Sequence, residues 1–336
     1  MQIFKKMTWF EKLMGFEEIS PENVRKNINI DGENMLSKVN GKSYRFGKLE
    51  VPSLTDLRRK INLRDFKGQI SLSETVANVG ELHRSPENNR AVFQAASQFN
   101  LLEMVHPGVT PEEGVGIYEN DATQGPACAI ACGAGTVYRN YFVPLHGQLG
   151  QTEHHQINCL SLFEDFFDNH KFGLWTMRNG YCYPTAQGLE RINAQIAAMD
   201  DDERESLNGR LKVGIQWDTE VTTASTHQIV SQVYCAAFPI GYISDITEKQ
   251  WESFARIILE ATYEATFYAA LINLKNSGSN RLFLTLVGGG VFRNKTEWIL
   301  DAINKSLNKF RNADLEVSVV SYGQSNERIK RMMDNF

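Results

Sequence analysis

The chain has 336 residues, of which 42% are hydrophobic and 22% are charged, as in an ordinary soluble globular protein. Its formal net charge of −5 argues against a broad nucleic-acid interface, which needs a basic face. No segment approaches the roughly 20 consecutive apolar residues of a membrane span. We therefore expect neither nucleic acid nor a membrane among the partners.

The cysteines and the N-terminal sequence indicate the compartment. The chain contains 5 cysteines without a C-x-x-C pair, which favours free thiols in a reducing environment. The first residues are interrupted by charges and lack the continuous apolar stretch of a signal peptide. We expect a cytoplasmic protein, or one delivered to a host cytosol if it is an effector. The neighbouring His154 and His155 lack metal-ligand spacing, so no metal and no cofactor is predicted.

Residues 1–68 are predicted to form an N-terminal helical extension. Ser20 before Pro21, and Ser53 followed by Asp56, are typical of helix starts. Nothing in this segment indicates its function.

From residue 69 to 336 the pattern is strand, turn and helix, which predicts an α/β core. Runs this apolar are typical of strands covered on both faces. The predicted strands are 91–97, 211–217, 282–287 and 315–321. Thr247 and Gln250 have capping-box spacing at the start of a long amphipathic helix. The irregular residues 147–210 are predicted to be an insertion.

The run "LTLVGGGVFRN" places Gly288, Gly289 and Gly290 between an apolar strand and a helix. Because glycine has no Cβ, backbone amides can approach a ligand closely, and a loop beside a helix start can bind an anion. The alternative is a tight turn that only packs. Asn294 and Glu297 have the spacing of a capping box at the start of the following helix.

A second segment, "EEGVGIYENDATQGPACAIACGAG", leads through an acidic loop to Gln124, Gly125 and Pro126. The proline suits the first turn of a helix. That first turn is either a phosphate cradle or a plain helix start. Cys128 and Cys132 are interpreted as packing residues of the helix.

A third segment, "AASQFNLLEM", carries Gln98, Asn100 and Glu103 just after a predicted strand. Polar amides at the carboxyl end of a strand suit a ribose or base site. An ordinary turn is the alternative, since asparagine is common in turns.

These three segments, in this order, resemble the macrodomain superfamily, whose members bind ADP-ribose between two loops. "AASQFN" with "EEGVGIYENDATQGPA" is similar to the first loop, and "VGGGVFRN" to the second. The usual Asn-Ala-Ala-Asn run is replaced by Gln94-Ala95-Ala96-Ser97, and the first loop lacks the triple glycine and paired glutamates of poly(ADP-ribose) glycohydrolases. It is more similar to divergent macrodomain hydrolases, among them bacterial effectors that remove ADP-ribose from arginine of ubiquitin.

The resemblance implies a three-layer α/β/α fold with a mixed central sheet, and an ADP-ribosyl hydrolase that acts on an ADP-ribosylated protein, with arginine as one acceptor. It implies that ADP-ribose lies between the two loops. The ligand-binding residues that it implies are Gln98, Asn100, Gln124, Gly125, Gly288, Gly289, Gly290, Val291, Phe292 and Tyr322.

Cleavage of a glycosidic bond needs carboxylates near the anomeric carbon. Asp121 is the first candidate, followed by Glu119 and Glu113, although loop acids are also commonly solvated. Asp218 and Glu220 directly follow a buried run, and they either face the cleft or end the strand in water.

Two other hypotheses stay open. One is a module that binds ADP-ribose or a related nucleotide without cleaving it. The other is an unrelated α/β enzyme that acts on another nucleotide or on a sugar phosphate.

Overall fold

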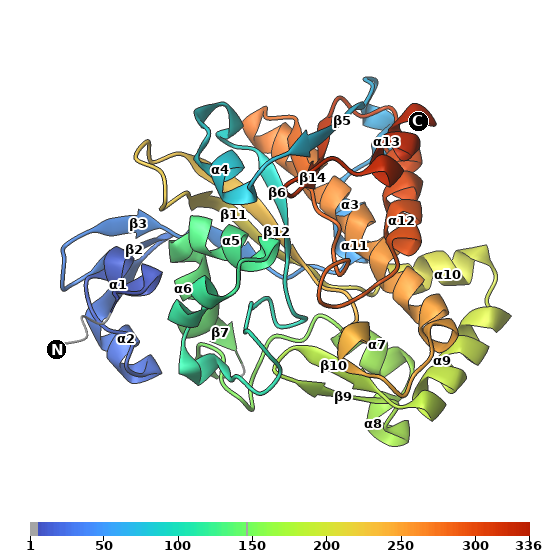
Figure 1. Ribbon diagram of the computed structural model, residues 1–336, viewed down its shortest axis with the longest axis horizontal. Helices are drawn as coiled ribbons and strands as arrows, with labels where there is room; N and C mark the ends of the chain where they lie inside the picture. The colour runs from blue at the N-terminus through green and yellow to red at the C-terminus, as the bar shows by residue number, and fades with distance from the viewer. Residues whose placement is uncertain (1–5, 146) are drawn as a thin grey trace.

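A mixed seven-stranded sheet forms the centre of the computed structural model, which describes residues 6–145 and 147–336 (Figure 1). The strand order is β4–β11–β12–β6–β13–β14–β5. The strands are β4 (Lys48–Glu50), β5 (Ser71–Val76), β6 (Val92–Ala96), β11 (Gly214–Glu220), β12 (Ile229–Cys235), β13 (Arg281–Leu284) and β14 (Glu316–Ser321). β12, β6, β13, β14 and β5 are parallel, whereas β11 pairs antiparallel with both β12 and β4. The predicted α/β class with a mixed central sheet is confirmed.

Helices cover both faces of the sheet, which gives three layers (Figure 1). One face carries α4 (Val79–Arg84), α5 (Gln124–Ala131) and α6 (Gly133–Tyr141), and the other carries α11 (Glu248–Ser277) and α12 (Thr296–Lys309). Alternating side chains of β6 divide between the two layers. Phe93 stacks on His83 of α4, whereas the neighbouring Gln94 donates a hydrogen bond from Nε2 to Thr266 of α11 at 2.9 Å.

The long helix α11 has 30 residues, and it begins at the capping box that the sequence predicts. Thr247 and Gln250 form the capping box, and Gly278 ends the helix in the left-handed conformation. α12 differs from the prediction, because it begins at Thr296 and its first residues have no side-chain cap. Asn294 instead donates from Nδ2 to the carbonyl oxygens of Phe238 and Gly288, so it closes the glycine turn.

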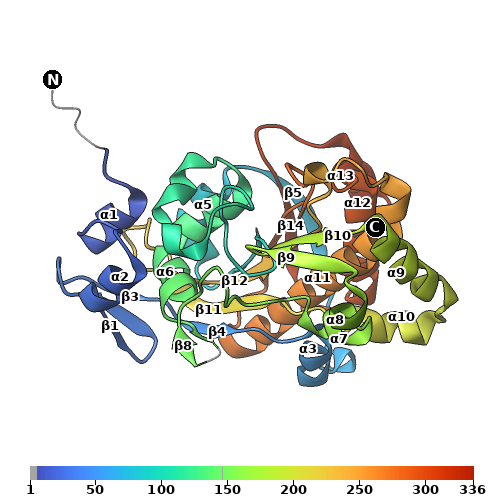
Figure 2. The ribbon, with the colours of Figure 1, turned by 90° about the horizontal axis from the view of Figure 1, so that it is seen from below.

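Residues 6–68, the described part of the predicted helical extension, contain strands as well as helices. The helices α1 (Trp9–Met14), α2 (Pro21–Asn27) and α3 (Leu54–Lys60) are present, and Ser20 and Ser53 cap α2 and α3 as predicted. However, β1 (Ile28–Asp31), β2 (Asn34–Ser37) and β3 (Ser43–Arg45) form a small antiparallel sheet, and β4 is an edge strand of the central sheet. The two-residue turn Gly32-Glu33, with Gly32 at a φ of 56°, joins β1 to β2, whose ends pair through Asp31 and Asn34. Figure 2 shows α1, α2, β1 and β3 beside α6.

Residues 147–210, whose status as an insertion stays a prediction, contain short helices and a hairpin. These elements are β8 (Gln148–Leu149), which pairs with β7 (Pro144–Leu145), then α7 (Ser161–Phe166), α8 (Asn169–Phe172), β9 (Trp175–Arg178), β10 (Tyr181–Pro184), α9 (Ala186–Ala198) and α10 (Asp201–Asn208). α9 and α10 pack against α11. The chain closes with α13 (Glu327–Asp334). No helix in the described part of the chain has both the length and the apolar character that a membrane crossing requires.

Candidate functional site

The carboxyl ends of the five parallel strands meet at one edge of the sheet, where ligands bind in many α/β proteins. The residues that follow these strands line two neighbouring cavities of about 770 and 270 Å³. Both cavities share Thr123, Gln124, Thr285, Leu286 and Gly290 in their walls, so they form one continuous cleft.

The two glycine-bearing loops meet in this cleft, although they are far apart in the sequence. Gly125 of the first loop and Gly288 and Gly290 of the second line the smaller cavity, together with Gln98, Val291 and Phe292. Gly289 and Tyr322 line the larger cavity. The cleft thus brings together nine of the ten residues that the sequence comparison with macrodomains suggested for ligand contact. Asn100, the tenth, is buried outside it, where its Nδ2 donates to Gln156 and its Oδ1 accepts the amide of Leu102.

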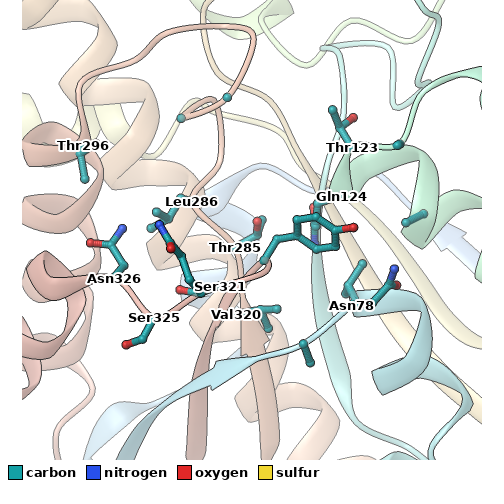
Figure 3. Close-up of a pocket in the computed structure, with 18 of the residues that line it drawn as sticks. Asn78, Thr123, Gln124, Thr285, Leu286, Thr296, Val320, Ser321, Ser325 and Asn326 are labelled. Atoms are coloured by element: carbon teal, nitrogen blue, oxygen red, sulfur yellow. The ribbon is translucent and has the colours of Figure 1, made fainter.

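The larger cavity has polar side chains on both sides (Figure 3). Thr123, Gln124 and Asn78 lie on one side, and Thr296 and Asn326 lie on the other. Tyr322 is 78% exposed, so it is not a core residue and is available for stacking.

The glycines of the second loop have different physical roles. Gly288 has a φ of 76°, and a Cβ there would lie 2.5 Å from the Cβ of Ala237, so this glycine is required by packing. A Cβ on Gly290 would meet no protein atom within 4 Å, because the residue faces open space. The amides of Gly290 and Val291 make no hydrogen bond within the described chain. They are therefore free to donate to an anion.

The start of α5 is fixed to the sheet by Gln124. Its Oε1 accepts the amide of Ala96 at 3.3 Å, and its Nε2 donates to the carbonyl oxygen of Gln94 at 3.1 Å. Thr123, the N-cap residue, makes no capping bond with its side chain. The first turn of α5 thus presents its amides at the cleft, next to the glycine loop.

Glu103 is the buried acid of the smaller cavity, and it was not among the predicted catalytic residues. Its side chain is 8% exposed, and Oε1 has no hydrogen-bond partner within the described chain. Burial raises the pKa of Glu103 well above its usual value, and the charge of Asp121 raises it further, while Arg139 opposes the shift. Glu103 therefore keeps its proton to a higher pH than an ordinary glutamic acid does.

Asp121, the first predicted catalytic residue, lines the same cavity and is half-buried. Its Oδ1 accepts the amide of Thr123 at 2.8 Å, which orients the carboxylate at the start of α5. Glu103 and Asp121 thus face one space from two elements, one buried and one in contact with solvent. Such a pair separates the acid and base roles of two carboxyl groups.

Three aromatic rings form the wall beside this acid pair. Tyr181 of β10 lies 5.5 Å from both Tyr242 and Phe292, measured between ring centroids, and the latter two are 5.9 Å apart. The hydroxyl of Tyr181 donates to the carbonyl oxygen of Met104. Among the described residues, no lysine, arginine or histidine lines either cavity.

The other predicted acids lie outside the cleft. Glu119 accepts the amide of Trp9 with Oε2 at 2.9 Å, and the exposed Glu113 caps a short 3-10 helix through the amide of Thr110. The sequence left open whether Asp218 and Glu220 face the cleft or end their strand in water. That strand is β11, which runs antiparallel to its neighbour β12, so both residues lie at the opposite edge of the sheet.

One signal for Glu103 was present in the sequence. The residue interrupts the apolar run Leu101–Val105, and a charge in a buried segment needs either a partner or a function. Tyr181, Tyr242 and Asn78 had no comparable signal, because only the fold brings them to the cleft.

The sequence matches no family model and no curated protein. The fold is similar to two solved structures of poly(ADP-ribose) glycohydrolase. The enzyme from Thermomonospora curvata, bound to the inhibitor ADP-HPD, is 12% identical, with 94% of this chain and 96% of that chain covered and a TM-score of 0.45. The enzyme from Deinococcus radiodurans, in complex with ADP-ribose, is 10% identical, with 86% and 94% covered and a TM-score of 0.46. The chemistry of the cleft is therefore derived from the residues of this chain alone.

Proposed function

We propose that the protein is an ADP-ribosyl hydrolase that releases ADP-ribose from a modified protein side chain. The observation that carries the proposal is the pairing, in one cleft, of free backbone amides with the two acids Glu103 and Asp121. Amides suit a diphosphate, and a pair of carboxyl groups in different environments suits cleavage of a glycosidic bond.

The proposed ligand lies along the length of the cleft. Its diphosphate is held by the amides at Gln124 and Gly125 and by those of Gly290 and Val291, whereas the amide of Gly289 is already bonded to the carbonyl oxygen of Leu286. The adenosine occupies the larger cavity, where Tyr322 is free to stack on the base. The distal ribose enters the smaller cavity, which brings its anomeric carbon to the acids.

In the proposed reaction, Glu103 donates its proton to the leaving atom of the acceptor as the bond to the anomeric carbon breaks. Asp121 accepts a proton from the attacking water, whose oxygen forms the new bond to that carbon. The products are ADP-ribose and the unmodified side chain, and one water is consumed. The raised pKa of Glu103 suits the acid role, since the residue keeps its proton to a higher pH than an ordinary glutamic acid.

Arginine is the proposed acceptor. The catalytic end of the cleft has two carboxyl groups and three aromatic rings, and no basic side chain lines it among the described residues. This environment favours a guanidinium, which carboxylates and aromatic faces both attract. A serine or glutamate acceptor would have no comparable partner.

Two measurements on the unmodified protein test the proposal. Calorimetry with ADP-ribose should show binding, and a peptide carrying ADP-ribose on arginine should release it at a rate proportional to enzyme concentration. Binding without release would identify a non-catalytic ADP-ribose-binding module. Absence of binding to ADP-ribose, with binding to another nucleotide, would identify an unrelated α/β enzyme.

A further inference from the structure

The N-terminal segment is joined to the acidic loop of the cleft by several buried or part-buried hydrogen bonds. Glu18 reaches this loop and accepts the amide of Val115 with Oε1 at 2.9 Å and the amide of Gly116 with Oε2 at 2.7 Å. The hydroxyl of Tyr141, on α6, donates to the same carboxylate at 2.6 Å. Three donors therefore converge on one carboxylate, which is a fixed arrangement and not a surface contact.

The backbone of the loop is adapted to this carboxylate. Gly114 has a φ of 93°, and a Cβ on it would lie 2.6 Å from Oε2 of Glu18. A Cβ on Gly116 would lie 2.8 Å from the same oxygen. Two glycines of the "EEGVGIYEN" segment are thus explained by the approach of Glu18, and neither lines the cleft.

Trp9 makes a second connection between the same two segments. Its ring nitrogen donates to the carbonyl oxygen of Val115, and its backbone amide donates to Glu119, both at 2.9 Å. The residue is 8% exposed. The predicted catalytic residue Glu119 therefore has a role in holding the loop to α1.

The loop held in this way carries one acid of the cleft, Asp121, and supports the other, Glu103. The short 3-10 helix η4 (Gly116–Asn120) follows directly after Val115, and Asp121 ends it, with its amide bonded to the carbonyl oxygen of Tyr118 at 3.1 Å. The buried hydroxyl of Tyr118 accepts the amide of Glu103 at 3.0 Å. A displacement of η4 would therefore move Asp121 and remove a support of Glu103.

We propose that residues 8–18 are a brace for the acid pair, and that Glu18 is a positioning residue for the reaction. This inference rests on the proposed function for its effect on turnover, but the brace itself can be measured without turnover. The diphosphate contacts at Gln124 and the second glycine loop are held by other elements. Loss of the brace should therefore affect catalysis more than binding of ADP-ribose.

The test compares Glu18→Gln with Glu22→Gln in the full-length protein. The first substitution retains one acceptor oxygen but turns an NH₂ group toward the other donors, so the brace is weakened without a cavity. Glu22 is the control, because its side chain is 78% exposed and forms an ion pair with Arg25 on the same helix. The readouts are hydrogen exchange of the loop amides, the calorimetric affinity for ADP-ribose, and kcat on the arginine-linked peptide.

We expect Glu18→Gln to exchange faster than Glu22→Gln at Val115, Gly116 and the residues up to Asp121. Its kcat should fall by roughly 10- to 100-fold, as for small displacements of reacting groups, while the affinity for ADP-ribose changes less than about 3-fold. Equal exchange in the two variants would overturn the brace. Faster exchange with unchanged kcat, in a wild-type protein that turns over, would overturn the positioning role. An inactive wild-type protein would refute the proposed function and leave the exchange result to decide the brace.

If Glu18→Gln does not fold, Tyr141→Phe removes one of the three donors and retains both amide contacts. The same exchange and kcat comparisons then apply with a smaller expected effect. Tyr141→Phe with control-level exchange and kcat would overturn the proposal.

Discussion

Replacement of Glu103 by glutamine removes the proposed proton donor and keeps the shape of the side chain. Because Oε1 has no partner within the described chain, that atom loses no protein contact. A positioned general acid contributes about 10²- to 10⁴-fold to a rate. This range corresponds to about 3 to 5 kcal/mol of barrier, at 1.36 kcal/mol for each factor of ten. We therefore expect kcat to fall by this factor.

The same substitution should not weaken the fold. Because the pKa of Glu103 is raised, the folded protein keeps a proton that the unfolded chain releases above pH 4.5. This contribution to stability is fully present below pH 4.5 and is lost as the pH rises toward the folded pKa. Glutamine does not titrate, so the stability of Glu103→Gln should not fall in this way as the pH rises. Chemical denaturation at neutral pH should give a free energy of unfolding at or above that of the wild type.

The assay is release of ADP-ribose from the arginine-linked peptide, with calorimetric affinity for ADP-ribose measured alongside. Glu113→Gln is the matched control, since Glu113 is an exposed acid of the acidic loop and only caps a 3-10 helix. Affinity should stay within about threefold of the wild type in both variants, because glutamine keeps the size of the glutamate side chain and neither residue supplies an amide to the proposed diphosphate site. Wild-type turnover by Glu103→Gln would refute the acid role of Glu103. Loss of turnover by Glu113→Gln would indicate that an acid of the exposed loop takes part in catalysis.

Three further outcomes are expected. Asp121→Asn should lower turnover by about 100-fold or more and retain ADP-ribose binding, in the same two assays, because water activation is lost. Gly290→Ala should weaken ADP-ribose binding at unchanged stability, since its Cβ would meet no protein atom, whereas Gly288→Ala should lose about 1–3 kcal/mol of stability by crowding Ala237; equal behaviour of the two would contradict their separate roles. Burial lowers the pKa of His83 from 6.5 to about 4. Below pH 6.5 the unfolded chain therefore binds a proton that the folded protein does not bind. About 3 kcal/mol of stability should be lost as the pH falls from 6.5 to 4. His83→Phe should flatten that dependence in denaturant titrations at several pH values, and an unchanged slope would exclude His83 as its source.

The sequence predicted what depends on local pattern. Apolar runs located β6, β11, β13 and β14, and capping signals located α11. β12 was missed because its central Ser231 and Gln232 are polar, although both are buried. Gln232 is satisfied by the carbonyl oxygen of Cys128 and by the ring of His83, which are partners that no local pattern reveals.

The errors in the candidate site came from strand direction and from long-range contacts. Asp218 and Glu220 were placed correctly at a strand end, but the end of an antiparallel strand lies at the wrong edge for the cleft. The acids of the first loop could not be ranked either, because Glu119 is engaged by Trp9, which is 110 positions away in the chain. The role of the N-terminal segment was invisible for the same reason.

The glycines of the two loops look alike in the sequence, but they have different structural roles. A Cβ on Gly125 would lie 2.4 Å from Oε1 of Glu103 and 2.6 Å from the carbonyl oxygen of Ala96. Because Gly125 has no side chain, the carboxyl group of Glu103 and the end of β6 can pack closely against the start of α5. Gly290 faces open space, since a Cβ on it would meet no protein atom within 4 Å. Glycine in the first loop thus makes room for the acid, whereas Gly290 in the second loop leaves room for a ligand beside the free amides.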